Sequence, residues 1–164
     1  DGCDCLLAEE MLQLVVPKVL VIEMAFHIPP PFMFTAQHDH ARSDAWLDAL
    51  HTQTFTPTAG CSLTYALRRF QPHGLHLLRL TDVDAVFVHE SVLAVVADAF
   101  GVQFPQDEFE CYRQSRLWMQ LPISHVREWF FDAHPASSLS KIWANITWAN
   151  RLGGRPDAPF TLQY

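Results

Sequence analysis

The stretch from Val19 to Met24 constrains the fold most strongly, because it is apolar apart from Glu23 and lies between prolines. Pro17 precedes it, and three consecutive prolines follow at positions 29–31. A short run that is apolar on both faces is typical of a strand buried on both sides in a parallel α/β sheet. We therefore predict a buried, parallel-type strand here, followed by a loop over residues 28–43.

Helical patterns flank this predicted strand. Apolar residues recur at helical spacing over residues 6–16, 62–71 and 91–100. Residues 75–80 and 85–89 are typical of two strands, and the short turn between them favours an antiparallel pair. This order predicts an α/β fold, with one parallel-type strand and an antiparallel strand pair at the edge.

The composition changes near Phe104, where the chain becomes rich in aromatic residues and in helical patterns. We therefore predict two parts: a partial α/β domain over residues 1–103, and an aromatic-rich helical extension over residues 104–164. An aromatic helix at 138–152 is suited to docking a protein partner, and equally to covering a sheet. The sequence leaves both roles open.

The charge of the chain limits its partners. Its 164 residues include 11 basic and 18 acidic side chains, which give a net charge of −7. This balance leaves no basic face for nucleic acid and disfavours anionic membrane surfaces. No apolar run is long enough to predict a membrane span.

The cysteines predict a reducing environment. The four residues, at positions 3, 5, 61 and 111, match neither a small disulfide framework nor a pair of CxxC motifs. We interpret them as small core-facing thiols and expect an intracellular, cytoplasmic location, since the N-terminal residues do not resemble a signal peptide. Without a secretory signal, the glycosylation sequon at Asn145-Ile146-Thr147 is interpreted as coincidental.

Several segments together resemble FkbM-type methyltransferases over residues 1–92. Asp1-Gly2-Cys3-Asp4 is similar to the end of that family's fourth strand, and residues 17–23 are similar to its next strand. Residues 60–63 and 84–88 resemble a later helix start and the last strand, with Asp84 where the family tends to have Asn. The resemblance implies a Rossmann-like sheet with an antiparallel last strand, and S-adenosylmethionine (SAM)-dependent O-methyl transfer to a small-molecule or glycan hydroxyl.

The same resemblance implies that the cofactor half is absent. Rossmann-like sheets hold their cofactor beside a glycine-rich turn after the first strand, and this chain contains no GxGxxG motif. We therefore expect the chain to be the C-terminal half of a methyltransferase-like domain, inactive by itself, with SAM held elsewhere.

Four residues are candidate catalytic residues under this interpretation. Asp1 and Asp4 would lie at the carboxyl end of a strand and face the transferring methyl group. Glu23, a carboxylate in an apolar strand, and His27 in the following loop would face the substrate. The simpler alternatives are that Asp4 caps a helix, that Glu23 bonds backbone or an arginine, and that His27 is an ordinary loop residue.

Two further functions remain open. His38, Asp39 and His40 form the strongest local metal signal, so a metal-dependent enzyme is one of them. His27 and His51 lie within reach along the chain. Nothing in the sequence fixes which residue would be a third ligand beside the two histidines, and such a motif in a polar loop is usually solvated. The other is a non-catalytic interaction module, which would need to cover the edge of the strand that begins at Val19.

Overall fold

The computed structural model describes residues 3–37, 60–81, 83–115, 119, 135–152 and 157–164. The candidate Asp1 and the motif His38-Asp39-His40 lie outside these residues. So do residues 44–50 and 124–131, where the sequence pattern favours two more short helices.

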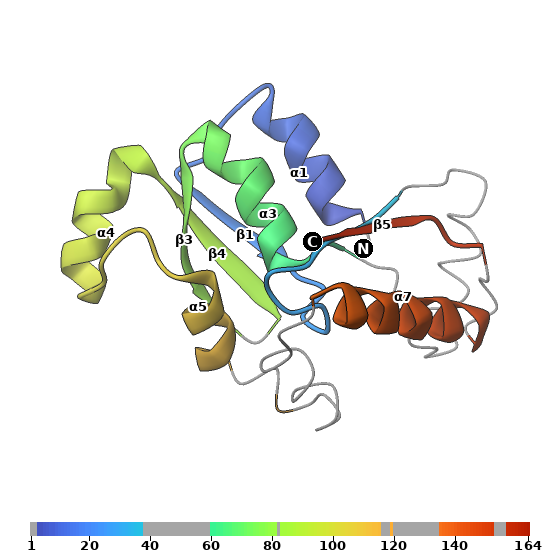
Figure 1. The fold of residues 1–164 in the computed structure, drawn as a ribbon. Helices are drawn as coiled ribbons and strands as arrows, with labels where there is room; N and C mark the ends of the chain where they lie inside the picture. Colours follow the sequence, from blue (N-terminus) through green and yellow to red (C-terminus); the bar gives the residue numbers. More distant parts are fainter. Residues whose placement is uncertain (1–2, 38–59, 82, 116–118, 120–134, 153–156) are drawn as a thin grey trace.

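A three-stranded sheet forms the centre of the structure (Figure 1). It contains β1 (Val19–Glu23), β3 (Leu75–Leu80) and β4 (Asp84–His89) in the order β1-β4-β3. The last strand, β4, is antiparallel to both neighbours, so β1 and β3 run in the same direction. The predicted antiparallel pair is confirmed, because a three-residue connection returns the chain directly alongside β3.

Helices α1 (Asp4–Leu12) and α3 (Leu63–Phe70) cover one face of this sheet (Figure 1). Their apolar residues meet Ile22 of β1 and Phe87 of β4 in one buried cluster. Phe70 and Phe87 pack edge to face, with ring centroids 5.3 Å apart. Such aromatic pairs add stability beyond the area that they bury, so this contact anchors α3 on the central strand.

The opposite face of β1 is open, which corrects the prediction of a strand buried on both sides. Val19 and Val21 are 53% and 57% exposed, whereas Ile22, which points toward the helices, is 6% exposed. The prediction of a parallel-type pairing is also wrong for the contact that the structure describes, since β1 pairs antiparallel with β4. An apolar run shows what a strand can bury, and only the neighbouring elements decide whether a layer covers it.

Helices α4 (Leu93–Phe100) and α5 (Glu108–Gln114) follow the sheet, and short 3-10 turns at Gln71–His73 and Glu90–Val92 lie beside it. Helix α4 ends at Gly101, whose φ of 63° is the left-handed conformation that glycine adopts without strain. Helix α5 places Cys111 and Tyr112 in the same buried cluster as α1 and α3. Residues beyond position 103 therefore complete the core of the first part.

A second sheet consists of β2 (Met33–Ala36) and β5 (Phe160–Gln163), paired antiparallel. Helix α7 (Pro135–Leu152) lies beside it and buries Ile142 and Ile146 against Phe34. The predicted loop over residues 28–43 therefore contains a strand, and the extension over 104–164 contains another. Neither is visible in the sequence, because each strand is stabilised by a partner more than a hundred residues away.

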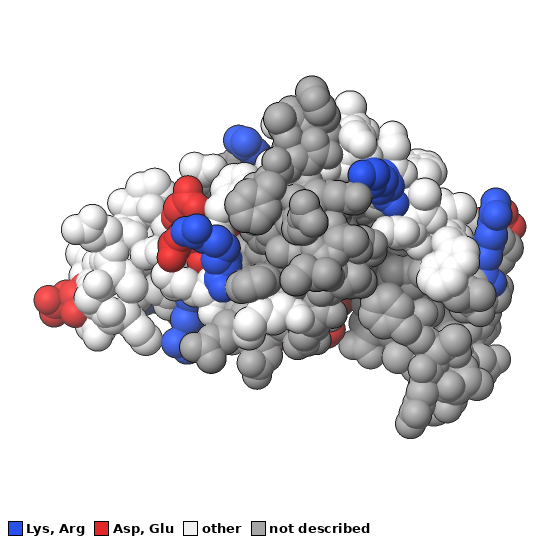
Figure 2. All heavy atoms as spheres, turned by 60° about the horizontal axis from the view of Figure 1, so that its bottom comes forward, with Lys and Arg blue, Asp and Glu red and all other residues white. Residues whose placement is uncertain are grey.

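The described surface carries scattered charges. In the face shown in Figure 2, basic and acidic side chains lie singly or in small mixed groups between uncharged residues. Within the described residues, no helix is both long enough and apolar enough to cross a membrane.

Candidate functional site

The carboxyl end of β1 is where the two sheets meet. Met24 forms a parallel bridge with Cys61, and Thr35 of β2 forms an antiparallel bridge with the same residue. The Ala25 amide donates to the carbonyl of Cys61 at 2.7 Å, and the Ala36 amide donates to that of Gly60 at 3.0 Å. The segment before α3 is therefore held between the end of β1 and β2.

The backbone conformation of Gly60 favours glycine at the start of this segment. Its φ is 65°, and a Cβ added there would lie 3.6 Å from the carbonyl oxygen of Glu23. That distance leaves room for a methyl group, so the positive φ is what favours glycine at this position.

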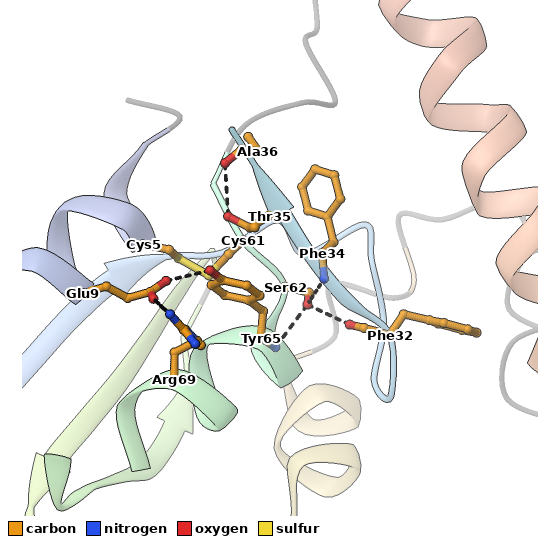
Figure 3. Close-up of a disulfide and its surroundings, with 10 residues drawn as sticks. All are labelled: Cys5, Glu9, Phe32, Phe34, Thr35, Ala36, Cys61, Ser62, Tyr65 and Arg69. Atoms are coloured by element: carbon orange, nitrogen blue, oxygen red, sulfur yellow. Dashed lines mark hydrogen bonds and ion pairs between the residues drawn. A yellow bond between two sulfur atoms is a disulfide. The ribbon is translucent and has the colours of Figure 1, made fainter. Parts of the chain in front are cut away.

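A disulfide joins Cys61 to Cys5 in the first turn of α1 (Figure 3). The two Cα atoms are 6.0 Å apart, within the usual range for such bonds. The prediction that these two cysteines are free thiols is therefore wrong. The prediction that they face the core is confirmed, since Cys5 and Cys61 are 1% and 0% exposed. Cys111 is buried and outside the disulfide, as predicted. Burial raises the pKa of its thiol to about 11, so it is not a nucleophile at neutral pH.

Beside the disulfide, Glu9 of α1 accepts two hydrogen bonds from α3 (Figure 3). The Tyr65 hydroxyl donates to one carboxylate oxygen at 2.7 Å, and Arg69 Nε donates to the other at 2.6 Å. Burial, together with the neighbouring Glu9 carboxylate, raises the pKa of Tyr65 to about 12. This cluster joins the two helices that cover the sheet, and its role is structural.

The Tyr65 hydroxyl predicts a loss of stability at alkaline pH. Because its pKa is raised in the folded state from an ordinary value of 10.0 to about 12, stability is fully present below pH 10 and falls as the pH rises toward 12. Urea unfolding at intervals between pH 9 and 12 measures this decline. Tyr65→Phe, which has no ionisable hydroxyl, should flatten the curve; an equally steep curve would contradict the assignment.

Ser62 fixes the entry to α3. Its hydroxyl donates to the carbonyl of Phe32 at 2.7 Å and accepts from the amides of Phe34, at 2.9 Å, and Tyr65, at 3.3 Å. The last contact is an N-cap, and the other two attach β2 to the helix start (Figure 3). Ser62 is fully buried, so its hydroxyl is used for structure and not for catalysis.

The structure brings three of the predicted site residues to one end of the sheet. Asp4 begins α1 next to the disulfide, Glu23 ends β1 next to the Met24–Cys61 bridge, and His27 follows four residues later. Asp4 and His27 are half-buried. The His27 ring lies 6.3 Å from that of Phe34, measured between centroids.

Glu23 is exposed, which corrects the expectation of a buried carboxylate. Because side chains alternate along a strand, it points to the same open face as Val19 and Val21. Its Cα partner across the sheet is Asp84, which is half-buried. In the sequence, Asp84 stands out only as a departure from the family pattern. The register of β1 against β4 places Asp84 directly opposite Glu23, so that two acidic residues are neighbours at this end of the sheet.

The three residues of the metal hypothesis, His38, Asp39 and His40, lie outside the described part of the chain. Among the residues that are described, no group of three or more His, Cys, Asp or Glu side chains could hold a metal ion.

A separate cleft of about 350 Å³ lies between α3, β3 and the start of α5. It is lined by Arg68, His76, Asp107 and Glu108, together with apolar residues. The Glu108 carboxylate accepts a hydrogen bond from the Thr64 hydroxyl at 2.9 Å, and burial raises its pKa. None of the predicted site residues lines this cleft, so it is not part of the site at β1.

Comparison with known proteins identifies no relative: no family model, no curated protein and no solved structure matches this chain.

Proposed function

We propose that this chain is the C-terminal, substrate-side portion of a SAM-dependent methyltransferase-like domain that methylates a hydroxyl of a small molecule or glycan. The observation that carries the proposal is the position of the last strand. Strand β4 lies between β1 and β3 and is antiparallel to both, while those two run in the same direction. A Rossmann-like sheet with an antiparallel last strand, as the family resemblance implies, would have such a strand between two neighbours that run in the same direction.

The position of the polar residues supports the same proposal. In open α/β sheets, ligands bind beyond the carboxyl ends of the strands. Asp4, Glu23 and His27 lie at that end of β1. A carboxylate there is suited to accept the proton of an acceptor hydroxyl, and an imidazole is suited to orient its oxygen.

The open edge of β1 also supports a partial domain. The outer edge of β1 has no partner strand among the described residues. The side chains of Val19 and Val21 are also exposed, on one face of the same strand. Soluble proteins usually cover or charge such an edge. Further strands of the same sheet would cover it, whereas an independent interaction module would have to cover it with its own elements.

The glycines among the described residues are not arranged like those of a glycine-rich cofactor turn. The three glycines with positive φ, at positions 60, 74 and 101, stand at a helix entry and at two helix ends, not in a glycine-rich turn after a strand. The part that we assign to this chain is therefore to bind and orient the acceptor hydroxyl, and the cofactor is held by residues outside it.

Calorimetric titration of S-adenosylhomocysteine into this chain, and into a version extended upstream, tests the proposal. We expect binding by the extended version alone. In that version Asp4→Asn should keep cofactor binding and lower turnover by about 10²–10⁴, the usual contribution of a catalytic acid or base. Lys141→Gln, at an exposed position on α7, is the matched control and should change neither. Binding by neither version, or by the short chain alone, would overturn the proposal.

A second candidate, a non-catalytic interaction module, is favoured by the exposed aromatic residues of α7. Trp143 and Trp148 are 48% and 63% exposed, although Ile142 and Ile146 of the same helix are buried. Failure of both versions to bind S-adenosylhomocysteine would favour this function.

A further inference from the structure

The disulfide indicates the kind of compartment in which the chain folds. Cys5 and Cys61 are separated by 56 positions in the sequence and are both buried. Disulfides form and persist in oxidising compartments and are rare in the cytosol, where thiols are kept reduced. The bond therefore removes the ground for expecting a reducing compartment, which rested on the cysteines being thiols.

In an oxidising secretory compartment, the glycosylation sequon on α7 no longer has to be interpreted as coincidental. The chain contains two asparagines, Asn145 and Asn150. Asn145 is exposed and is followed by Ile146 and Thr147, whereas Asn150 is buried and is followed two positions later by Leu152. A glycan is bulky and must project from the surface, and only Asn145 meets both the sequence and the exposure requirement.

We propose that Asn145 carries an N-linked glycan and that the chain matures in an oxidising secretory compartment. In the transfer, the side-chain amide nitrogen of Asn145 attacks the anomeric carbon of a lipid-linked pyrophosphate oligosaccharide. A nitrogen–carbon bond forms, the bond from that carbon to the pyrophosphate oxygen breaks, and the amide loses one proton. The lipid pyrophosphate leaves with the electron pair, so no oxidant or reductant is needed.

The surroundings of Asn145 suit an attached sugar. Trp148 lies three residues further along the helix and is therefore on the same face as Asn145. Its side chain is 63% exposed. The flat, apolar ring gives the first sugar a surface to pack on, which would cover part of an otherwise exposed tryptophan. Ile146, between Asn145 and Thr147, is buried, so the helix holds the modified face outward.

The test uses protein isolated from the cells that make it. Trypsin cleaves after Lys141 and Arg151 and releases a peptide of residues 142–151 that contains both asparagines. Treatment with peptide N-glycosidase F in ¹⁸O-water converts a glycosylated asparagine into ¹⁸O-labelled aspartate. We expect most of this peptide to appear only after treatment, with the label at Asn145 and none at Asn150. Recovery of mainly unmodified peptide before treatment would overturn the proposal.

Variants and thiol labelling sharpen the result. Asn145→Gln and Thr147→Ala should abolish the label, whereas Thr147→Ser, which keeps the sequon, should retain it.

Alkylation of the denatured, unreduced protein should modify Cys3 and Cys111 and leave Cys5 and Cys61 unmodified. Alkylation of all four cysteines would overturn the assignment of the compartment.

Discussion

Replacing both Cys5 and Cys61 by alanine is expected to lower the free energy of unfolding by about 4 kcal/mol. The bond closes a loop between positions 56 residues apart, and closing a loop of this length removes about that much conformational freedom from the unfolded chain. The loss is a large share of the 5–15 kcal/mol that stabilises a typical domain. Urea unfolding followed by circular dichroism measures it.

Cys111→Ala is the matched control for this variant. Cys111 is buried in the same cluster but lies outside the disulfide, so its replacement removes a thiol without removing a cross-link. We expect a cost of about 1 kcal/mol, the common size of a point-mutation effect. A double variant as stable as Cys111→Ala would show that the cross-link does not constrain the unfolded chain.

Phe87→Ala is expected to cost about 3–5 kcal/mol, the range measured for large-to-small changes at buried aromatic positions. Phe87 lies on the central strand β4, is fully buried and packs against Phe70. Its removal leaves a cavity between the sheet and α3. Urea unfolding again measures the effect. If the alanine variant does not fold, Phe87→Leu, which keeps more of the volume, should fold with a smaller loss.

Val21→Ala is the control on the opposite face of the same sheet. Val21 is the cross-strand partner of Val86 in β4 and is 57% exposed, so its truncation should change stability by no more than about 0.5 kcal/mol. A cost as large as that of Phe87→Ala would show that another layer covers this face in the chain itself. In a version extended upstream, by contrast, a larger cost for Val21→Ala would support the proposed continuation of the sheet.

Local elements were predictable because their determinants lie within a few residues. Helix α3 begins at Leu63, one residue after the predicted start, and Gly101 ends α4. The turn between Leu80 and Asp84 is short enough that the two strands have to pair. In each case the physical cause is a cap, a backbone conformation or a short connection. All three depend on residues at the ends of the element itself, which are read directly from the sequence.

The candidate site was predictable only in part. The sequence indicated Asp4, Glu23 and His27, and the bridges at Cys61 place them at one end of the sheet. The exposure of Glu23 was not predictable, because an apolar strand pattern does not reveal which of its faces a helix covers. The position of Asp84 opposite Glu23 depends on strand register, which follows from pairing across more than sixty residues.

The sequence by itself determined the helices α1, α3 and α4, the antiparallel β3–β4 pair and the net charge of −7. Only the tertiary structure decided the Cys5–Cys61 bond, the pairing of β2 with β5 and the open face of β1. The physical reason is the range of the interactions. Caps, turns and side-chain periodicity act over a few residues, whereas disulfides, sheet partners and covering layers join segments that the chain brings together only when it folds.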